Sequence, residues 1–131
     1  MSKFNNDSKF DIDLKYGKVK EKEVADMLEN STIEVKTERG QWLNTGNIVI
    51  EYSCYGKPSG ISNTKADFWF HNLALKDGNF CSLVFPVATL KKYVLENKLR
   101  AISGGDNNAA QMYLVPLKEL FDSKNIQGLI S

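Results

Sequence analysis

Two short stretches of alternating polarity, separated by eight residues, constrain the fold of this chain more than any other feature. The first, TIEVKTE, separates two apolar from three charged residues, namely Ile33 and Val35 from Glu34, Lys36 and Glu38. The second, NIVIEY, sets Ile48 and Ile50 opposite Val49 and Glu51. A period of two is typical of strands. Because residues 39–46 (RGQWLNTG) read as a loop, the two strands are expected to form an antiparallel hairpin.

The rest of the chain predicts mainly helices around this hairpin. A helix over 15–29 follows from the stripe of Val24, Ala25 and Leu28, and residues 1–13 look like a polar, flexible arm. Thr64 is expected to cap a helix that runs to Leu75, with Asp67 three residues later. Further expected elements are a strand over 80–85, a helix over 89–97, a strand over 112–115 and a helix over 117–121. The expected fold is one α/β or α+β domain over residues 1–131, with a small mixed sheet and a β-hairpin core flanked by helices.

Composition narrows the class of protein. The hydrophobic fraction of 42% and the charged fraction of 25% are ordinary for a globular domain. No apolar run approaches the ~20 residues that span a bilayer, and the start MSKFNNDSKFDID has no signal-peptide core. An intracellular, cytoplasmic protein without a membrane partner is therefore expected. Cys54 and Cys81 form no CxxC pair and are expected to be reduced thiols in or near the core.

His71 is the only histidine, which excludes nucleases and metal sites that rely on paired histidines. Chemistry must then rest on carboxylates, lysine and a divalent metal that prefers oxygen ligands. The net charge of +1 is low for a protein that binds DNA through general basicity. Phosphate contacts would need local basic clusters, unless these are simply solvated helix faces: Lys15, Lys18, Lys20 and Lys22, or Lys91, Lys92, Lys98 and Arg100.

Glu34 and Lys36 are the first candidates for a site, because residues i and i+2 of a strand point to the same face. A carboxylate beside an ammonium suits phosphodiester hydrolysis with Mg²⁺. If Glu38 pairs with Asn47, the hairpin register places Glu34 opposite Glu51, and such like charges repel unless a cation lies between them. The alternatives are an ordinary exposed strand face and a register shifted by one or two residues.

Glu21 is the third candidate, since it falls within the apolar helical stripe of Val24, Ala25 and Leu28. A carboxylate at such a position needs a partner or a metal ion. The alternative is a residue at the edge of the stripe whose carboxylate reaches water. A helix acid, an E-x-K strand and a second strand acid would converge at one end of the hairpin.

The stretch from GKVKEKEVADML through TIEVKTERGQWLNTGNIVIEY to SCYGKPSGISNTKADFW resembles small phage-type PD-(D/E)XK nucleases, including Holliday-junction resolvase-like proteins. The resemblance covers residues 11–70. It implies a restriction-endonuclease-like fold, a phage-encoded origin in a bacterial host, and one or two Mg²⁺ ions held by acids on a helix and on strands. Carried over, Glu21 is the helix acid, and Glu34 with Lys36 belongs to the E-x-K element.

The family places an aspartate on a strand before E-x-K, and no such strand lies between Glu21 and Glu34. In one solution, Glu34 takes the role of the family's aspartate and Glu51 takes the role of the glutamate in E-x-K. Ser53 then stands at the usual lysine position, so Lys36 would supply the lysine instead. In the other, Glu34 and Lys36 form the regular element and the missing acid is Asp11 or Asp13. The first solution is preferred, because it explains why Glu34 and Glu51 would face each other.

Lys57, Ser59 and Lys65 follow the second strand and are weaker candidates for DNA phosphate contacts. Asp67 is more simply a helix-cap partner of Thr64. Trp42 could stack on an unpaired base or cover the core.

The expected function is that of a metal-dependent DNA endonuclease, a hydrolase of phosphodiester bonds, with branched DNA as a candidate substrate. Its catalytic residues would be Glu21, Glu34, Lys36 and Glu51, with Mg (or Mn) held by Glu21, Glu34 and Glu51. DNA is the expected partner, and a homodimer is expected because a domain this small cuts two strands most readily as a pair. The alternative is a non-catalytic DNA- or protein-binding module on a nuclease-like fold.

Overall fold

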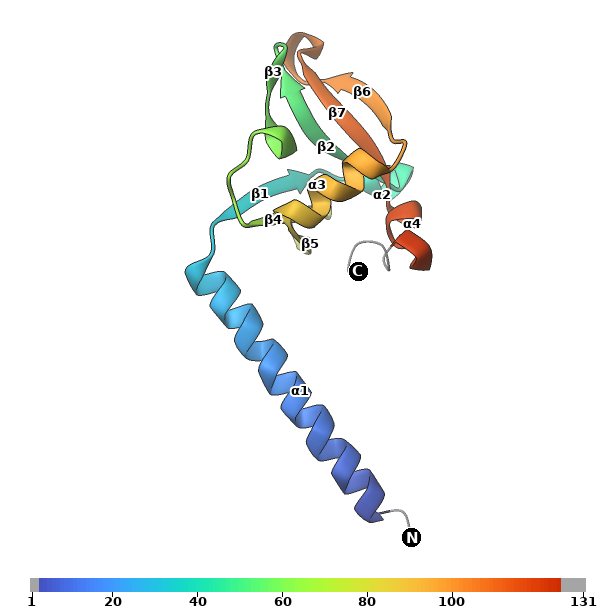
Figure 1. Cartoon of the computed structure of the whole chain (residues 1–131). Coiled ribbons are helices and arrows are strands. Elements are labelled where there is room, and N and C mark those ends of the chain that lie inside the picture. Colours follow the sequence, from blue (N-terminus) through green and yellow to red (C-terminus); the bar gives the residue numbers. More distant parts are fainter. Residues whose placement is uncertain (1–2, 126–131) are drawn as a thin grey trace. The chain divides into compact units, whose positions relative to one another are not determined.

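The computed structural model describes residues 3–125, with side chains from residue 9 onward. The chain divides into two compact units, residues 1–31 and 32–131. Along the sequence (Figure 1) the described elements are α1 (Lys3–Asn30), β1 (Ile33–Glu38), α2 (Gln41–Thr45), β2 (Asn47–Cys54), β3 (Lys57–Pro58), η1 (Gly60–Ser62), β4 (Phe68–Ala74), β5 (Phe80–Pro86), α3 (Val87–Glu96), β6 (Arg100–Gly104), η2 (Asp106–Asn108), β7 (Ala110–Pro116) and α4 (Leu117–Leu120). None of the described helices is long and apolar enough to cross a membrane.

The first unit is the single helix α1, 28 residues long. It contains the predicted helix over 15–29 and also residues 3–13, which the sequence analysis assigned to a flexible arm. Lys20 and Glu23 form an ion pair with 3.1 Å between Nζ and Oε2. The hydrogen bond to Glu23 and its charge raise the pKa of Lys20.

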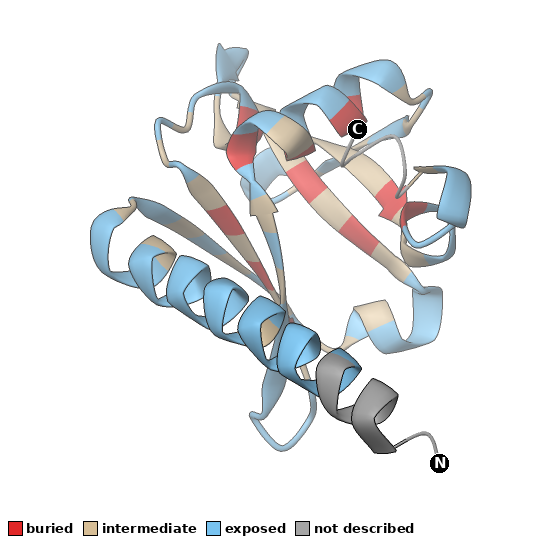
Figure 2. Cartoon of the chain, turned by 60° about the horizontal axis from the view of Figure 1, so that its bottom comes forward, coloured by how far each residue is buried: buried red, intermediate tan, exposed pale blue. Residues whose placement is uncertain are grey.

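The second unit contains two small sheets, which confirms the predicted α+β class and the mixed sheet. One sheet has the strand order β1-β4-β5, with β1 parallel to β4 and β4 antiparallel to β5. The other is antiparallel, with the order β3-β2-β7-β6. A hydrophobic core joins both sheets with η1, α3 and α4, and buried positions alternate along the central strands (Figure 2).

The predicted hairpin between residues 33–38 and 47–52 is wrong. β1 pairs with β4, whereas β2 pairs with β3 and β7, so the two strands belong to different sheets. The segment between them is not a hairpin loop but contains α2, which Gly46 ends in the left-handed conformation at φ 72°. The Trp42 indole N–H donates to the Ala74 carbonyl at 2.8 Å and ties α2 to the end of β4. Glu34 and Glu51 therefore do not face each other as a strand pair.

The charged face of β1, rather than its apolar face, turns inward. Ile33 and Val35 are exposed, whereas Glu34, Lys36 and Glu38 are half-buried. The reason is that the inward face meets hydrogen-bonding and aromatic partners on β4 rather than an apolar layer. The exposed face of β1 continues across β4 to β5 in the rows Ile33, Phe68, Pro86 and Val35, Phe70, Val84.

The helix expected over residues 64–75 is a strand, β4. Its sequence FWFHNLA alternates, and Trp69, His71 and Leu73 are buried while the residues between them are half-buried. Asp67 is not a helix-cap partner, because its carboxylate accepts hydrogen bonds from the Thr32 amide at 3.0 Å and the Thr32 hydroxyl at 3.1 Å. These bonds fix the start of β1 beside the start of β4.

The remaining predictions have mixed outcomes. The strand over 80–85, the helix over 89–97, the strand over 112–115 and the helix after Pro116 are confirmed within a few residues by β5, α3, β7 and α4. The strand β6 was missed. Both cysteines are free, but Cys81 is exposed and Cys54 half-buried, so the expectation of a core position is wrong for Cys81.

Candidate functional site

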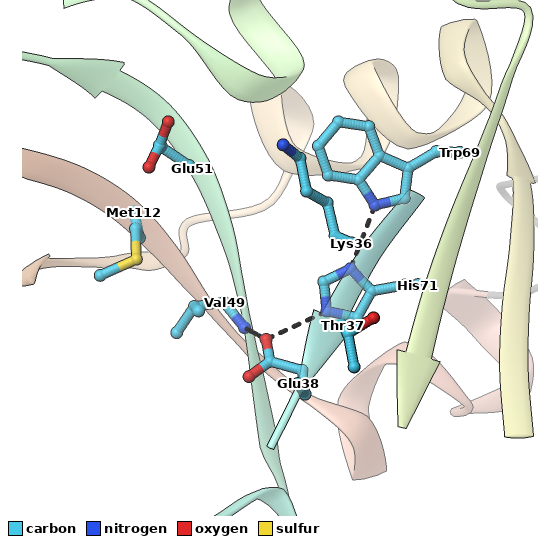
Figure 3. A pocket seen from close by; sticks show the side chains of 8 residues that line it. All are labelled: Lys36, Thr37, Glu38, Val49, Glu51, Trp69, His71 and Met112. Atoms are coloured by element: carbon cyan, nitrogen blue, oxygen red, sulfur yellow. Dashed lines mark hydrogen bonds and ion pairs between the residues drawn. The ribbon is translucent and has the colours of Figure 1, made fainter. Parts of the chain in front are cut away.

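A cavity of about 190 Å³ lies where β1 and β4 of one sheet meet β2 and β7 of the other. Its lining is formed by Lys36, Thr37, Glu38, Val49, Glu51, Trp69, His71 and Met112. Figure 3 shows Glu51 and Met112 on one side of this pocket and Trp69 and His71 on the other. The pocket thus combines one lysine, two glutamates and one histidine with apolar walls.

A chain of hydrogen bonds runs along the wall of the pocket (Figure 3). The Trp69 indole N–H donates to His71 Nδ1 at 3.1 Å, and His71 Nε2 lies 3.0 Å from Glu38 Oε1. The same Oε1 accepts the backbone N–H of Val49 at 2.7 Å. Because the indole nitrogen can only donate, Nδ1 must accept, and this assigns the proton to Nε2, which donates to Glu38.

Burial fixes this series of hydrogen bonds in place. Trp69 is 1% exposed and His71 is 2% exposed. Both occupy the inward face of β4, and their rings are nearly parallel, with 7° between the planes. A buried polar group without a partner is costly, so the histidine nitrogens and the Glu38 carboxylate support one another.

Lys36 and Glu51 carry charges that no counter-ion in the described part of the chain neutralises. Among the described residues, Lys20 and Glu23 form an ion pair and His71 meets Glu38 through the hydrogen bond from Nε2, and neither contact involves Lys36 or Glu51. The Lys36 ammonium lies 5.9 Å from the centre of the Trp69 ring, a cation–π contact that leaves its hydrogen-bond donors available. A free cation and a free carboxylate therefore line the same small cavity.

The strand pairing beside Glu51 is irregular. The pairing of β2 with β7 shifts register between Glu51 and Ser53, which is a β-bulge. Bulges often redirect side chains beside functional sites. Gly60 packs directly on the Glu51 backbone, and the Ser59 amide donates to the Tyr52 carbonyl at 3.1 Å.

Glu51 also lines a second cavity of about 190 Å³. The other residues of this cavity come from the end of β2 and from the turn between β6 and β7; they are Cys54, Tyr55, Gly105, Asp106, Ala109 and Ala110. Glu51 thus lines two cavities of the second unit, and only the first of them also contains Lys36.

The structure brings together two of the four predicted catalytic residues, Lys36 and Glu51. Glu34 is half-buried on the same face of β1 as Lys36, but it does not line the pocket. Glu21 lies on α1, in the first unit, as do Asp11 and Asp13. The candidates for phosphate contacts lie outside the pocket as well: Lys57 and Lys65 are exposed, and Ser59 is half-buried.

Sequence reasoning missed Glu38 and His71. The signal for Glu38 was present, because it shares one face of the alternating strand with Glu34 and Lys36. His71 gave a signal only through the alternation of β4, which was read as a helix. Within residues 3–125, no three histidine, cysteine or acidic side chains lie close enough together to hold a metal ion.

Comparison with known protein families, with curated proteins and with solved structures finds no match to this chain.

Proposed function

We propose that this protein is a metal-dependent DNA endonuclease that hydrolyses phosphodiester bonds at the pocket shared by Lys36 and Glu51. The observation that carries the proposal is that these two residues, chosen from the sequence for such chemistry, line one cavity and have no counter-ion among the described residues. An ammonium and a carboxylate suit a substrate with a negative phosphate and a cation that accompanies it.

The carboxylates that would hold the cation are Glu38 and Glu51. Glu38 takes the place that the sequence analysis gave to Glu34, because Glu38 lines the pocket and both of its hydrogen bonds fall on Oε1. Mg²⁺ is commonly bound by one or two carboxylates together with substrate phosphates, so two acids fit Mg²⁺ or Mn²⁺. When bound, such an ion stabilises the charge that develops on the phosphate.

Each of the remaining pocket residues that the proposal uses then has a defined role. Lys36 binds a non-bridging phosphate oxygen and steadies its negative charge. The Trp69 ring beneath Lys36 holds the ammonium at the pocket, and Glu51 at the bulge faces the same space. A C₂ homodimer is part of the proposal, because cutting both strands of DNA requires two such sites.

A non-catalytic DNA- or protein-binding module is the second candidate. It is favoured by the lack of a three-ligand group among the described residues. The net charge of +1 does not separate the two candidates, because both would bind through local contacts.

The test is a cleavage assay on plasmid and branched DNA with Mg²⁺, with Mn²⁺ and with excess EDTA, using wild type, Lys36→Ala and Glu51→Gln. The matched controls are Lys76→Ala and Glu96→Gln, which are exposed and do not line the pocket. The nuclease proposal expects metal-dependent cleavage that the two pocket variants lose and the controls keep. DNA binding without cleavage in wild type would favour the binding module, and cleavage in EDTA would exclude the proposed chemistry. Light scattering on the same samples would measure the oligomeric state.

A further inference from the structure

His71 is a buried titratable residue for which the proposed chemistry has no use. It is the only histidine of the chain and is 2% exposed, so it does not meet solvent. Both of its ring nitrogens have partners, Trp69 on β4 and Glu38 on β1. His71 can therefore act only through Trp69 and Glu38.

Glu38 joins the two sheets. It lies at the end of β1, and its Oε1 accepts the amide of Val49 on β2 at 2.7 Å. β3 is only two residues long and pairs with Ser53 and Cys54, so no strand of the described residues 3–125 lies along this edge of β2 beside Val49. The Glu38 carboxylate satisfies an amide that would otherwise lack a backbone partner there.

This bond fixes the two strands that carry the charged residues of the pocket. Lys36 lies two residues before Glu38 on β1, and Glu51 lies two residues after Val49 on β2. In a strand, a spacing of two keeps side chains on one face, about 7 Å apart. The position of the Glu38 carboxylate therefore affects the separation of Lys36 and Glu51.

We propose that His71 is a positioning residue that holds Glu38 as a clamp between β1 and β2 and so sets the geometry of Lys36 and Glu51. Trp69 contributes by donating to Nδ1, which leaves the proton on Nε2, the nitrogen that faces Glu38. Orienting partners of this kind typically affect activity by about 10- to 100-fold when removed. The consequence for cleavage rests on the proposed function, but the clamp itself does not.

Two amide substitutions separate the two bonds of His71. In His71→Gln, the side-chain amide can occupy the place of Nε2 and donate to Glu38. In His71→Asn, the shorter side chain can reach only the place of Nδ1, near Trp69. Both replace a buried ring by a smaller polar group, so a purely structural role would affect them alike.

The experiment measures the hydrogen exchange of the Val49 amide, the melting temperature and DNA cleavage with Mg²⁺ in wild type and both variants. We expect His71→Gln to keep the Val49 amide protected and to lose less than about 10-fold in kcat, whereas His71→Asn loses the protection and about 10- to 100-fold in kcat. Equal protection and equal kcat in the two variants would overturn the proposal. So would full protection of Val49 in His71→Asn.

Glu38→Gln keeps the test independent of how well the His71 variants fold. Its amide oxygen can still accept from Val49, so the protection of Val49 should persist while cleavage is lost; Glu38→Ala should lose both. Loss of protection in Glu38→Gln at an unchanged melting temperature would contradict the clamp. If wild type does not cleave DNA, the proposed function fails, while the exchange of Val49 across the four variants still decides the clamp.

Discussion

Lys36 is the residue for which position and chemistry agree best. Its ammonium is held over the Trp69 ring and has no carboxylate partner within 4.0 Å among the described residues. If it stabilises charge at the phosphate, Lys36→Ala should lower kcat by ~10²–10³, as for other single electrostatic groups. DNA affinity and melting temperature should change little. The measurement is single-turnover cleavage of a labelled duplex with Mg²⁺.

Lys76→Ala controls for the loss of one positive charge, because Lys76 is exposed and does not line the pocket. It should cleave like wild type. If Lys36→Ala weakens binding but cleaves as fast per bound complex, Lys36 serves only as a phosphate anchor.

Gly60 is the second residue whose role follows from its immediate surroundings. A Cβ at this position would lie 2.2 Å from the Glu51 carbonyl oxygen, and φ is +52°. Gly60→Ala should therefore combine the cost of a left-handed residue, about 1–2 kcal/mol, with overpacking of about 1–3 kcal/mol. Chemical denaturation gives the change in the free energy of unfolding.

Two other glycines separate the cost of the left-handed backbone from the cost of overpacking. Gly56 has φ +76° with no atom within 4 Å of the added Cβ, so Gly56→Ala should show the backbone cost alone. Gly40 has φ −57° and is equally open, so Gly40→Ala should stay within about 0.5 kcal/mol of wild type. Equal losses for Gly60→Ala and Gly56→Ala would mean that the contact with Glu51 is unimportant.

At the scale of elements, local patterns predicted most strands and helices but not how the strands pair. Alternation marks β1 and β2 clearly, yet it contains no information about which neighbour each strand meets. β1 finds its partner 35 residues away, in the register Ile33 with Phe68. The predicted hairpin assumed that neighbours in sequence are neighbours in the sheet, and the anchoring of α2 by Trp42 works against that assumption.

Alternation also does not say which face of a strand is inside. In β1 the charged face turns inward, because β4 offers it Trp69 and His71. Glu38 was overlooked as a site residue although it shares this face with Glu34 and Lys36. The alternation of FWFHNLA was obscured by the apparent cap of Thr64 and Asp67, and only the contact between Asp67 and Thr32 reveals why that segment begins a strand.

The exposure of the apolar face of β1 can be tested by comparing two aliphatic truncations. Val35 is 54% exposed, whereas Ile50 on β2 is 0% exposed. Val35→Ala should cost less than about 1 kcal/mol, and Ile50→Ala about 2–5 kcal/mol, because only the second leaves a cavity in the core. Urea denaturation measures both. If Val35→Ala lowers the free energy of unfolding by more than about 2 kcal/mol, the Val35 side chain must be packed in the core.

At the scale of the whole molecule, every member of the hydrophobic core belongs to the second unit. Deleting residues 1–31 should therefore leave a protein that melts cooperatively, because the truncation removes none of the core. Circular dichroism and calorimetry of the truncated chain test this. Loss of the cooperative transition would show that α1 is needed for folding of the second unit.

A metal ion bound at the proposed site would stabilise the whole molecule, since a ligand that binds only the native state stabilises it by mass action. At a Mg²⁺ or Mn²⁺ concentration of about 100 times Kd, wild type should gain about 2.7 kcal/mol. Glu38→Gln and Glu51→Gln should lose most of this gain, because these carboxylates line the pocket. Glu96→Gln, which alters an exposed acid on α3, should keep it. Thermal melts with metal and with EDTA give the difference for each variant.

The same melts decide between the acids chosen from the sequence and those found in the pocket. Glu34 shares a strand face with Lys36 but does not line the cavity, so Glu34→Gln should keep the metal-dependent gain. Glu21→Gln should also keep it if Glu38 and Glu51 are the only protein ligands. Loss of the gain in Glu21→Gln would assign a ligand to α1, in agreement with the prediction of Glu21 from the sequence. If both Glu38→Gln and Glu51→Gln keep the metal-dependent stabilisation, the pocket does not bind the metal ion. The non-catalytic binding module would then be the better proposal.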